Sequence, residues 1–104
     1  MFIYNVTVNV EDGIHDAWLS WMKQTHIADV LATNMFGKAR LTEVMVQGEQ
    51  GRTYSVQYEV KDMETLQLYF EVYAPKLQQE TADKFGDRAL AFRTVLRVEE
   101  DFTK

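Results

Sequence analysis

The chain has 104 residues, of which 46% are hydrophobic and 26% are charged, a composition typical of a folded globular protein. With 11 basic and 16 acidic residues the net charge is −5, which disfavours nucleic acid as a partner because no basic stripe is present to neutralise phosphates. Cysteine is absent, which excludes disulfides, thiolate metal sites and cysteine nucleophiles.

The rest of the composition indicates one domain over residues 1–104. Only 5 glycines and 1 proline are present, which leaves little material for linkers. The N-terminus lacks the basic region of a signal peptide, and no apolar stretch approaches the length of a membrane span. We therefore expect a cytoplasmic protein without a membrane partner.

The first half of the chain predicts a strand, a helix and a second strand. Residues 2–10 alternate with period two and carry β-branched side chains, which is typical of a strand. Asp12 is a candidate cap for the following helix, and a short helical turn over residues 27–32 continues that helix at an angle. Residues 36–46 form the second predicted strand, and the polar residues 47–51 form a hairpin loop.

The second half predicts a strand, a helix and a last strand. Residues 52–60 alternate again, and a long helical segment starts at Asp62. Pro75 lies inside this segment and predicts a kink or a restart of the helix. Gly86 suits a helix C-cap with positive φ, and residues 90–98 close the domain as the fourth strand.

This order predicts an α+β fold of ferredoxin-like βαββαβ topology. Its four strands form one antiparallel sheet, and both helices cover the same face of that sheet. The register of the second strand stays open. One hairpin pairing turns Arg40, Thr42 and Val44 to the uncovered face, and a slip of one residue turns the intervening residues there instead.

The two faces of the predicted sheet differ in their chemistry. Alternation assigns large apolar side chains to the covered face: Phe2, Tyr4, Val6, Val8, Tyr54, Val56, Tyr58, Leu90, Phe92 and Leu96. It assigns mostly small or neutral polar side chains to the other: Ile3, Asn5, Thr7, Thr53, Ser55, Gln57, Ala91, Arg93, Val95 and Arg97. Because a solvated face would carry more Lys and Glu, we expect a second copy to cover it, with a monomer as the alternative.

Five motifs spread over nearly the whole chain carry a resemblance to a known family. They are Tyr4-Asn5-Val6-Thr7, Trp18-x-x-Trp21-Met22-Lys23-x-x-His26-Ile27-x-Asp29-Val30-Leu31-Ala32-Thr33, Tyr54-Ser55-Val56-Gln57-Tyr58, Tyr73-Ala74-Pro75-Lys76-Leu77 and Phe85-Gly86-Asp87-x-Ala89-Leu90-Ala91-Phe92-Arg93-Thr94. In these motifs the chain resembles a bacterial family of unknown function, mainly from Bacteroidetes, within the dimeric α+β-barrel superfamily. The resemblance implies a homodimer with two sheets face to face, and it implies no activity.

Other members of that superfamily include cofactor-independent monooxygenases, haem-degrading enzymes and small-molecule isomerases. The haem-degrading and monooxygenase branch has an asparagine on the first strand, which Asn5 matches, a Trp near the third strand and a His on the second helix. Here residues 52–60 contain no Trp and residues 63–85 contain no His. We therefore do not extend that activity to this chain and expect no cofactor. Asn5 is expected to hydrogen-bond across the sheet or the dimer interface.

His26 is the best single candidate for chemistry. It lies at the end of the first predicted helix beside Asp29, where it can act as a general base or bond backbone carbonyls. By parity, Arg93 is predicted to point into the uncovered face, where it binds an anion or forms an ion pair across the interface. His15 is predicted to be a surface residue. No metal site is expected, because the two histidines lie about 16 Å apart along a helix.

Two functions are compatible with these residues. The one we favour is a non-enzymatic homodimer that serves interaction or binds a small molecule, with Asn5, His26 and Arg93 as ligand contacts. The alternative is a cofactor-independent enzyme of monooxygenase or isomerase type, in which His26 transfers a proton. The enzyme requires His26 and Arg93 to open onto one cavity of ligand size.

Overall fold

The computed structural model describes residues 1–46 and 50–104, so part of the predicted hairpin loop (residues 47–49) lies outside the described residues. The elements in chain order are β1 (Phe2–Val10), η1 (Asp12–Ile14), α1 (His15–Trp21), η2 (Met22–His26), α2 (Ile27–Leu31), β2 (Lys38–Val44), β3 (Arg52–Val60), α3 (Met63–Val72), α4 (Ala74–Phe85), η3 (Gly86–Arg88) and β4 (Ala89–Arg97). η1 and η3 are 3₁₀ turns, and η2 is a π-helical segment.

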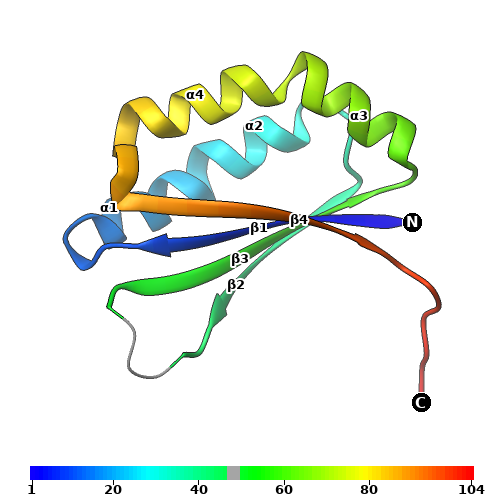
Figure 1. Ribbon diagram of the computed structural model, residues 1–104, viewed down its shortest axis with the longest axis horizontal. Helices are drawn as coiled ribbons and strands as arrows, with labels where there is room; N and C mark the ends of the chain where they lie inside the picture. The colour runs from blue at the N-terminus through cyan, green and yellow to red at the C-terminus, as the bar shows by residue number, and fades with distance from the viewer. Residues whose placement is uncertain (47–49) are drawn as a thin grey trace.

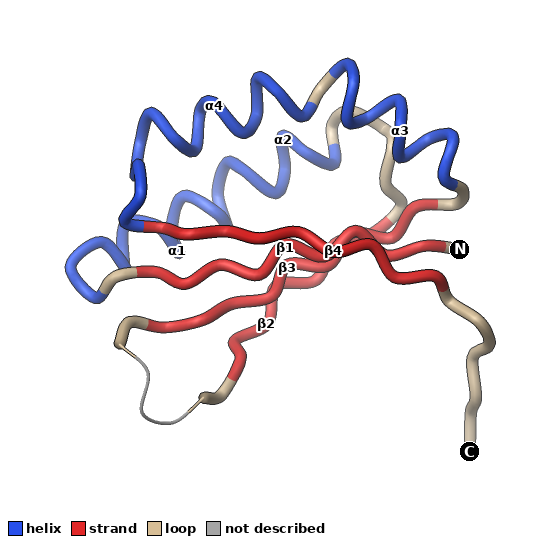
Figure 2. Tube along the Cα trace, viewed as in Figure 1, coloured by secondary structure: helices blue, strands red, loops and turns tan. Residues whose placement is uncertain are grey.

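The four strands form one antiparallel sheet in the order β2-β3-β1-β4. All four α-helices lie on one face of this sheet and leave the other face bare (Figures 1 and 2). The predicted ferredoxin-like fold is thereby confirmed. The segment after β4 runs away from the domain on the uncovered side of the sheet (Figure 1). No helix in residues 1–46 and 50–104 combines the length and apolarity that crossing a membrane requires.

The helices begin and end largely where local chemistry predicts. α4 restarts after Tyr73 with Pro75 in its first turn, where a missing N–H costs no hydrogen bond. Gly86 has a φ of 58°, as the predicted C-cap requires. The predicted Asp12 cap is wrong, because Asp12 is itself the first residue of η1 and no side chain caps η1 or α1.

The core lies between the helices and the two central strands. Its most completely buried large side chains are Trp18, Leu66, Val10, Val30, Val56 and Val60. Tyr4 on β1 is the centre of an aromatic cluster, with ring centroids 5.2–6.1 Å from those of Phe36, Tyr58, Tyr69 and Phe70. Each buried side chain of this size contributes roughly 1.5–3 kcal/mol by leaving water. The sheet and the helices are held together mainly by this burial.

The orientation of β4 differs from the prediction. Val6 on β1 lies opposite Arg93, and Phe2 lies opposite Arg97. Directly opposed residues of antiparallel strands project from the same face, so both arginines lie on the helix side with Val6 and Phe2. The prediction that Arg93 and Arg97 point into the uncovered face is wrong.

The prediction was wrong because apolar residues occupy both the odd-numbered and the even-numbered positions of β4. Leu90, Phe92 and Leu96 occupy one set of alternating positions, and Ala89, Ala91 and Val95 occupy the other. Alternation alone therefore does not fix which set faces the helices, whereas pairing with β1 does. The larger set lies on the uncovered face, where Leu90 and Phe92 are 61% and 62% exposed.

The register of β2, left open by the sequence, is fixed by its pairing with β3. Arg40 lies opposite Gln57, and Leu41 lies opposite Val56. Since Val56 belongs to the core, Leu41 faces the helices and Arg40 faces the uncovered side. The first of the two predicted pairings is the one present.

Candidate functional site

A cavity between the sheet and the helices is lined by both His26 and Arg93. The polar residues of its wall are Tyr4, His26, Tyr58, Gln78, Thr81 and Arg93, and most of the remaining wall is apolar, including Trp18, Met22 and Leu77. Gln78 on α4 and Arg93 on β4 are exposed, so the mouth of the cavity lies between these two elements. His26 and Arg93 thus share one cavity, which is one part of what the enzyme alternative requires; the other part is the size of that cavity.

The cavity is small. Its volume of about 60 Å³ is enough for a few water molecules or a small organic group. Pockets for drug-sized ligands measure about 300–1,000 Å³. A ligand held here is therefore compact, or extends past Arg93 into solvent.

His26 is held at the cavity by an unusual stretch of helix. It is the last residue of η2, and π-helical turns are rare and often occur at functional sites. Its ring stacks on Trp21 with centroids 4.7 Å apart and an interplanar angle of 27°. Its buried Nδ1 has no hydrogen-bond partner among the described residues. A buried nitrogen without a partner is costly.

The surroundings of His26 favour its neutral form. Burial lowers the pKa of the imidazole, the nearby Asp29 carboxylate raises it, and the Arg93 guanidinium lowers it again. The net effect is a pKa below the usual 6.5. Near pH 7 the cavity therefore presents an uncharged imidazole.

Tyr4 and Arg93 interact at the same cavity. Burial raises the pKa of the Tyr4 phenol, and interactions of its hydroxyl with Arg93 and Gln78 oppose this rise. The phenol remains protonated at neutral pH and can donate a hydrogen bond. Its place on the helix side was predicted, but the sequence gives no signal that its hydroxyl interacts with Arg93.

A neutral base, a fixed cation and a phenol donor around a mostly apolar cavity can do two kinds of chemistry. They can bind an anionic or carbonyl-bearing molecule, since electrostatic contacts strengthen where water is excluded. They can also move a proton at a carbon beside a carbonyl, with the imidazole as base. Both depend on His26 and Arg93 meeting.

Asn5 lies on the opposite face of the sheet and does not join these residues. Its Nδ2 donates to Thr7 Oγ1 and to Thr94 Oγ1, both at 3.2 Å. Ser55 Oγ donates to Asn5 Oδ1 at 2.6 Å. The expected hydrogen bonds of Asn5 across the sheet are thus present on the uncovered face.

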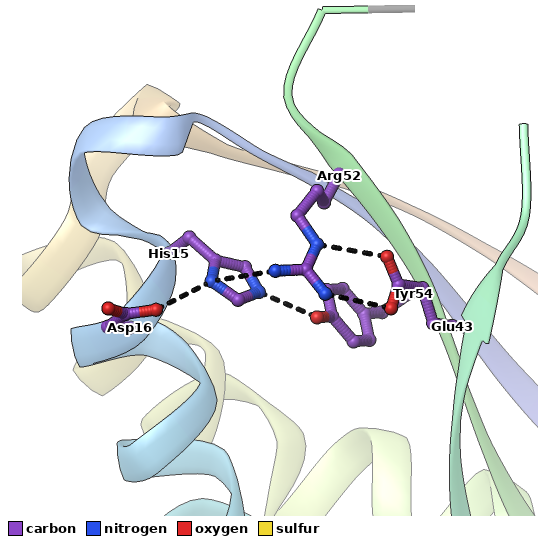
Figure 3. Close-up of polar contacts among 5 residues, drawn as sticks. All are labelled: His15, Asp16, Glu43, Arg52 and Tyr54. Atoms are coloured by element: carbon purple, nitrogen blue, oxygen red, sulfur yellow. Dashed lines mark hydrogen bonds and ion pairs between the residues drawn. The ribbon is translucent and has the colours of Figure 1, made fainter. Parts of the chain in front are cut away.

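His15 is the centre of a second polar cluster, shown in Figure 3. The prediction that it is a surface residue is wrong, because only 6% of it is exposed. Its Nε2 lies 2.6 Å from the Tyr54 hydroxyl and its Nδ1 lies 2.9 Å from Asp16 Oδ1. An imidazole protonated on Nδ1 satisfies both contacts, since it donates to Asp16 and accepts from Tyr54.

Arg52 completes this cluster. Its Nε and Nη2 each donate to the Glu43 carboxylate at 2.9 Å, and its Nη1 lies 3.4 Å from His15 Nδ1. His15 and Tyr54 are both buried, and the polar contacts of the cluster tie the start of α1 to β3. We assign it a structural role.

The geometry of residues 1–46 and 50–104 offers no metal centre. These residues contain no group of three or more metal-ligating side chains close enough to hold an ion.

The family to which the chain belongs is shown by its sequence. A family model described as "Domain of unknown function (DUF4286)" matches residues 1–99. The chain belongs to this family. A search of curated proteins found no match.

Solved structures similar to this DUF4286 chain share its fold. A mutant of MhuD with two manganese protoporphyrin IX groups bound per active site is 17% identical, with a TM-score of 0.71 and 100% of each chain covered. HapK from Hahella chejuensis is 11% identical, with a TM-score of 0.70 over 100% of this chain and 99% of that one. A dimeric ferredoxin-like protein from an uncultured marine organism is 14% identical, with a TM-score of 0.66 and 97% of each chain covered. At these identities the likeness shows the fold alone.

A porphyrin does not fit the cavity of this DUF4286 chain. The volume of about 60 Å³ is far too small for a macrocycle.

The electrostatics of the cavity predict how His26 titrates. We expect its pKa to lie below 6.5, to rise in Arg93→Gln and to fall in Asp29→Asn, because these changes remove a repelling cation and an attracting carboxylate. The measurement is an NMR pH titration of the His26 Cε1–H. Arg97→Gln, on the same face of β4 but opposite Phe2, is the control and should leave the pKa unchanged. Equal effects of Arg93→Gln and Arg97→Gln would contradict the placement of Arg93 beside His26.

Proposed function

We propose that the protein is a homodimeric domain that binds a small molecule in the cavity between its helices and its sheet. The observation that carries this proposal is the meeting of His26 and Arg93 at one mostly apolar cavity, with His26 Nδ1 buried and lacking a partner among the described residues. An apolar pocket with a few converging polar groups is the usual form of a small-molecule site.

The uncovered face supports the homodimer. Leu90, Phe92 and Leu96 are large, exposed and on this face, beside polar residues that carry no charge, such as Asn5 and Thr7. An exposed apolar stripe of this kind, interrupted only by Thr94, is typical of an interaction surface. A hollow of about 530 Å³ lined partly by Leu90 and Phe92 offers space for the side chains of a second sheet. One structural neighbour is itself described as dimeric.

Proton-transfer catalysis is the second candidate. It is favoured by one observation, the lowered pKa of His26 beside Arg93, which keeps the imidazole in the basic form at neutral pH. This activity and simple binding differ in one measurable respect. A catalytic His26 exchanges a C–H hydrogen of the bound molecule with deuterium from D₂O, and a His26→Gln variant does not.

The binding proposal predicts that a larger side chain placed in the cavity prevents ligands from binding there. In a thermal-shift screen of a small-molecule library, we expect compounds that raise the Tm of the wild type to lose this effect in Ala91→Phe. Ala91 lines the cavity on β4, and a phenyl ring there occupies the space of the ligand. Leu90→Phe, one residue away on the uncovered face, is the matched control and should keep the shifts. Shifts that persist in Ala91→Phe, or no compound that stabilises the wild type, would refute a cavity site.

The dimer is tested by the oligomeric state of two leucine variants. We expect the wild type to elute as a dimer in gel filtration with light scattering, and Leu90→Asp to weaken dimerisation by at least about tenfold, because a buried unpaired carboxylate is costly. Leu68→Asp, in an exposed position (46%) on α3 away from the uncovered face, carries the same change and should remain dimeric. A monomeric wild type would exclude this interface.

A further inference from the structure

The polar part of the cavity wall carries one full positive charge. Arg93 supplies this charge through its guanidinium group, whereas His26 is neutral near pH 7 because burial and Arg93 lower its pKa. Asp29, the carboxylate that raises the pKa of His26, does not line the cavity but lines a different pocket, beside Tyr73 and Lys76. The wall therefore holds a cation without its own counterion.

The guanidinium and its neighbours suit a carboxylate. A single Arg fork matches the two oxygens of a carboxylate in a bidentate contact. The Tyr4 hydroxyl, which interacts with Arg93, supplies a further donor at the same place. A phosphate dianion would bring a second negative charge that this wall does not neutralise, so a monoanion is the better match.

The rest of the wall defines the remainder of the ligand. Beyond the polar groups, it consists of side chains such as Val6, Val8, Trp18 and Leu77. These favour an aliphatic or aromatic body over a sugar or a polyol. The volume of about 60 Å³ limits that body to a few atoms inside the cavity.

We propose that the cavity binds the carboxylate of a small, mostly apolar monoanion between Arg93 and His26, and that the bound carboxylate draws one proton from solvent onto His26. This inference rests on the proposed function and names its ligand class. The proton forms a new N–H bond on the imidazole, which then donates to a carboxylate oxygen. No covalent bond of the ligand changes.

The charges around the imidazole explain why His26 takes up a proton when the carboxylate binds. In the free protein, burial and the Arg93 guanidinium disfavour imidazolium, and only Asp29 favours it. A carboxylate between the two side chains screens Arg93 and forms an ion pair with the new imidazolium, so both opposing effects weaken. The other polar residues of the wall stay neutral near pH 7: Tyr4, Tyr58, Gln78 and Thr81.

The experiment uses the full chain with acetate, butyrate and benzoate, each compared with its neutral amide, and with inorganic phosphate. Isothermal titration calorimetry in two buffers of different ionisation enthalpy counts the protons taken up. We expect at least one of the three carboxylates to bind at least tenfold more tightly than its amide and than phosphate. The uptake should approach one proton at a pH well above the pKa of free His26 and below its pKa in the complex. The NMR signal of His26 Cε1–H should move to its protonated position on binding.

Variants test whether Arg93 supplies the charge that binds the carboxylate and whether His26 takes up the proton. Arg93→Gln should lose at least tenfold in affinity, and Arg97→Gln, on the same face of β4, should lose none. His26→Gln should retain carboxylate binding but take up no proton. Equal binding of carboxylate and amide, tighter binding of phosphate, or proton uptake that persists in His26→Gln would overturn the inference.

The experiments distinguish failure of the carboxylate inference from failure of the proposed small-molecule site. If the library screen finds cavity ligands that Ala91→Phe abolishes but none of the three carboxylates binds, the ligand class is wrong and the binding site stands. If neither the library nor the carboxylates bind, both proposals fail.

Discussion

The pairing of β4 with β1 is the constraint on which the rest of the structure depends. With Val6 opposite Arg93, the guanidinium lies on the helix side and meets His26 and Tyr4 at one cavity, while Leu90 and Phe92 lie on the bare face. A shift of one residue would exchange these two sets of side chains. The cavity would then lack its cation, and the uncovered face would lose its apolar stripe. One register therefore sets both the candidate ligand site and the candidate interface.

The helices supply the remaining residues of the candidate site. The π-helical segment η2 ends at His26 and carries the imidazole to the cavity wall, where it stacks on Trp21. α4 closes the cavity from above the sheet with Leu77, Gln78 and Thr81. Because the enclosing wall is mostly apolar, charge in the cavity is poorly solvated, and this burial is the largest cause of the lowered pKa of His26, ahead of Asp29 and Arg93. The structural cluster of His15 shows the contrast, since both of its ring nitrogens already have partners.

Much of the fold could be predicted from the sequence, and less of the site. Residues 2–10 and 52–60 alternate so clearly that their strands and their buried faces were both predictable, and Pro75 and Gly86 marked the helix ends through their backbone chemistry. The face of β4 was not predictable, because both of its parities are apolar and only the hydrogen-bond register with β1 decides between them. For the same reason the meeting of Arg93 with His26 was not predictable. Burial of His15 depends on Tyr54, which is 39 residues away and gives no local signal.

The most direct test of this account asks which face of β4 points toward α4. The chain has no cysteine, so pairs of cysteines can be introduced and joined with a short bismaleimide without side reactions. Thr81 on α4 and Ala91 on β4 line the same cavity, whereas Leu90 lies on the other face of the sheet. The pairing of β4 with β1 predicts a crosslink within one chain for the pair Thr81→Cys and Ala91→Cys, and none for the pair Thr81→Cys and Leu90→Cys. The crosslinks are identified by mass spectrometry of the digested monomer band. A crosslink for the second pair and not for the first would contradict the register, and with it the proposed site.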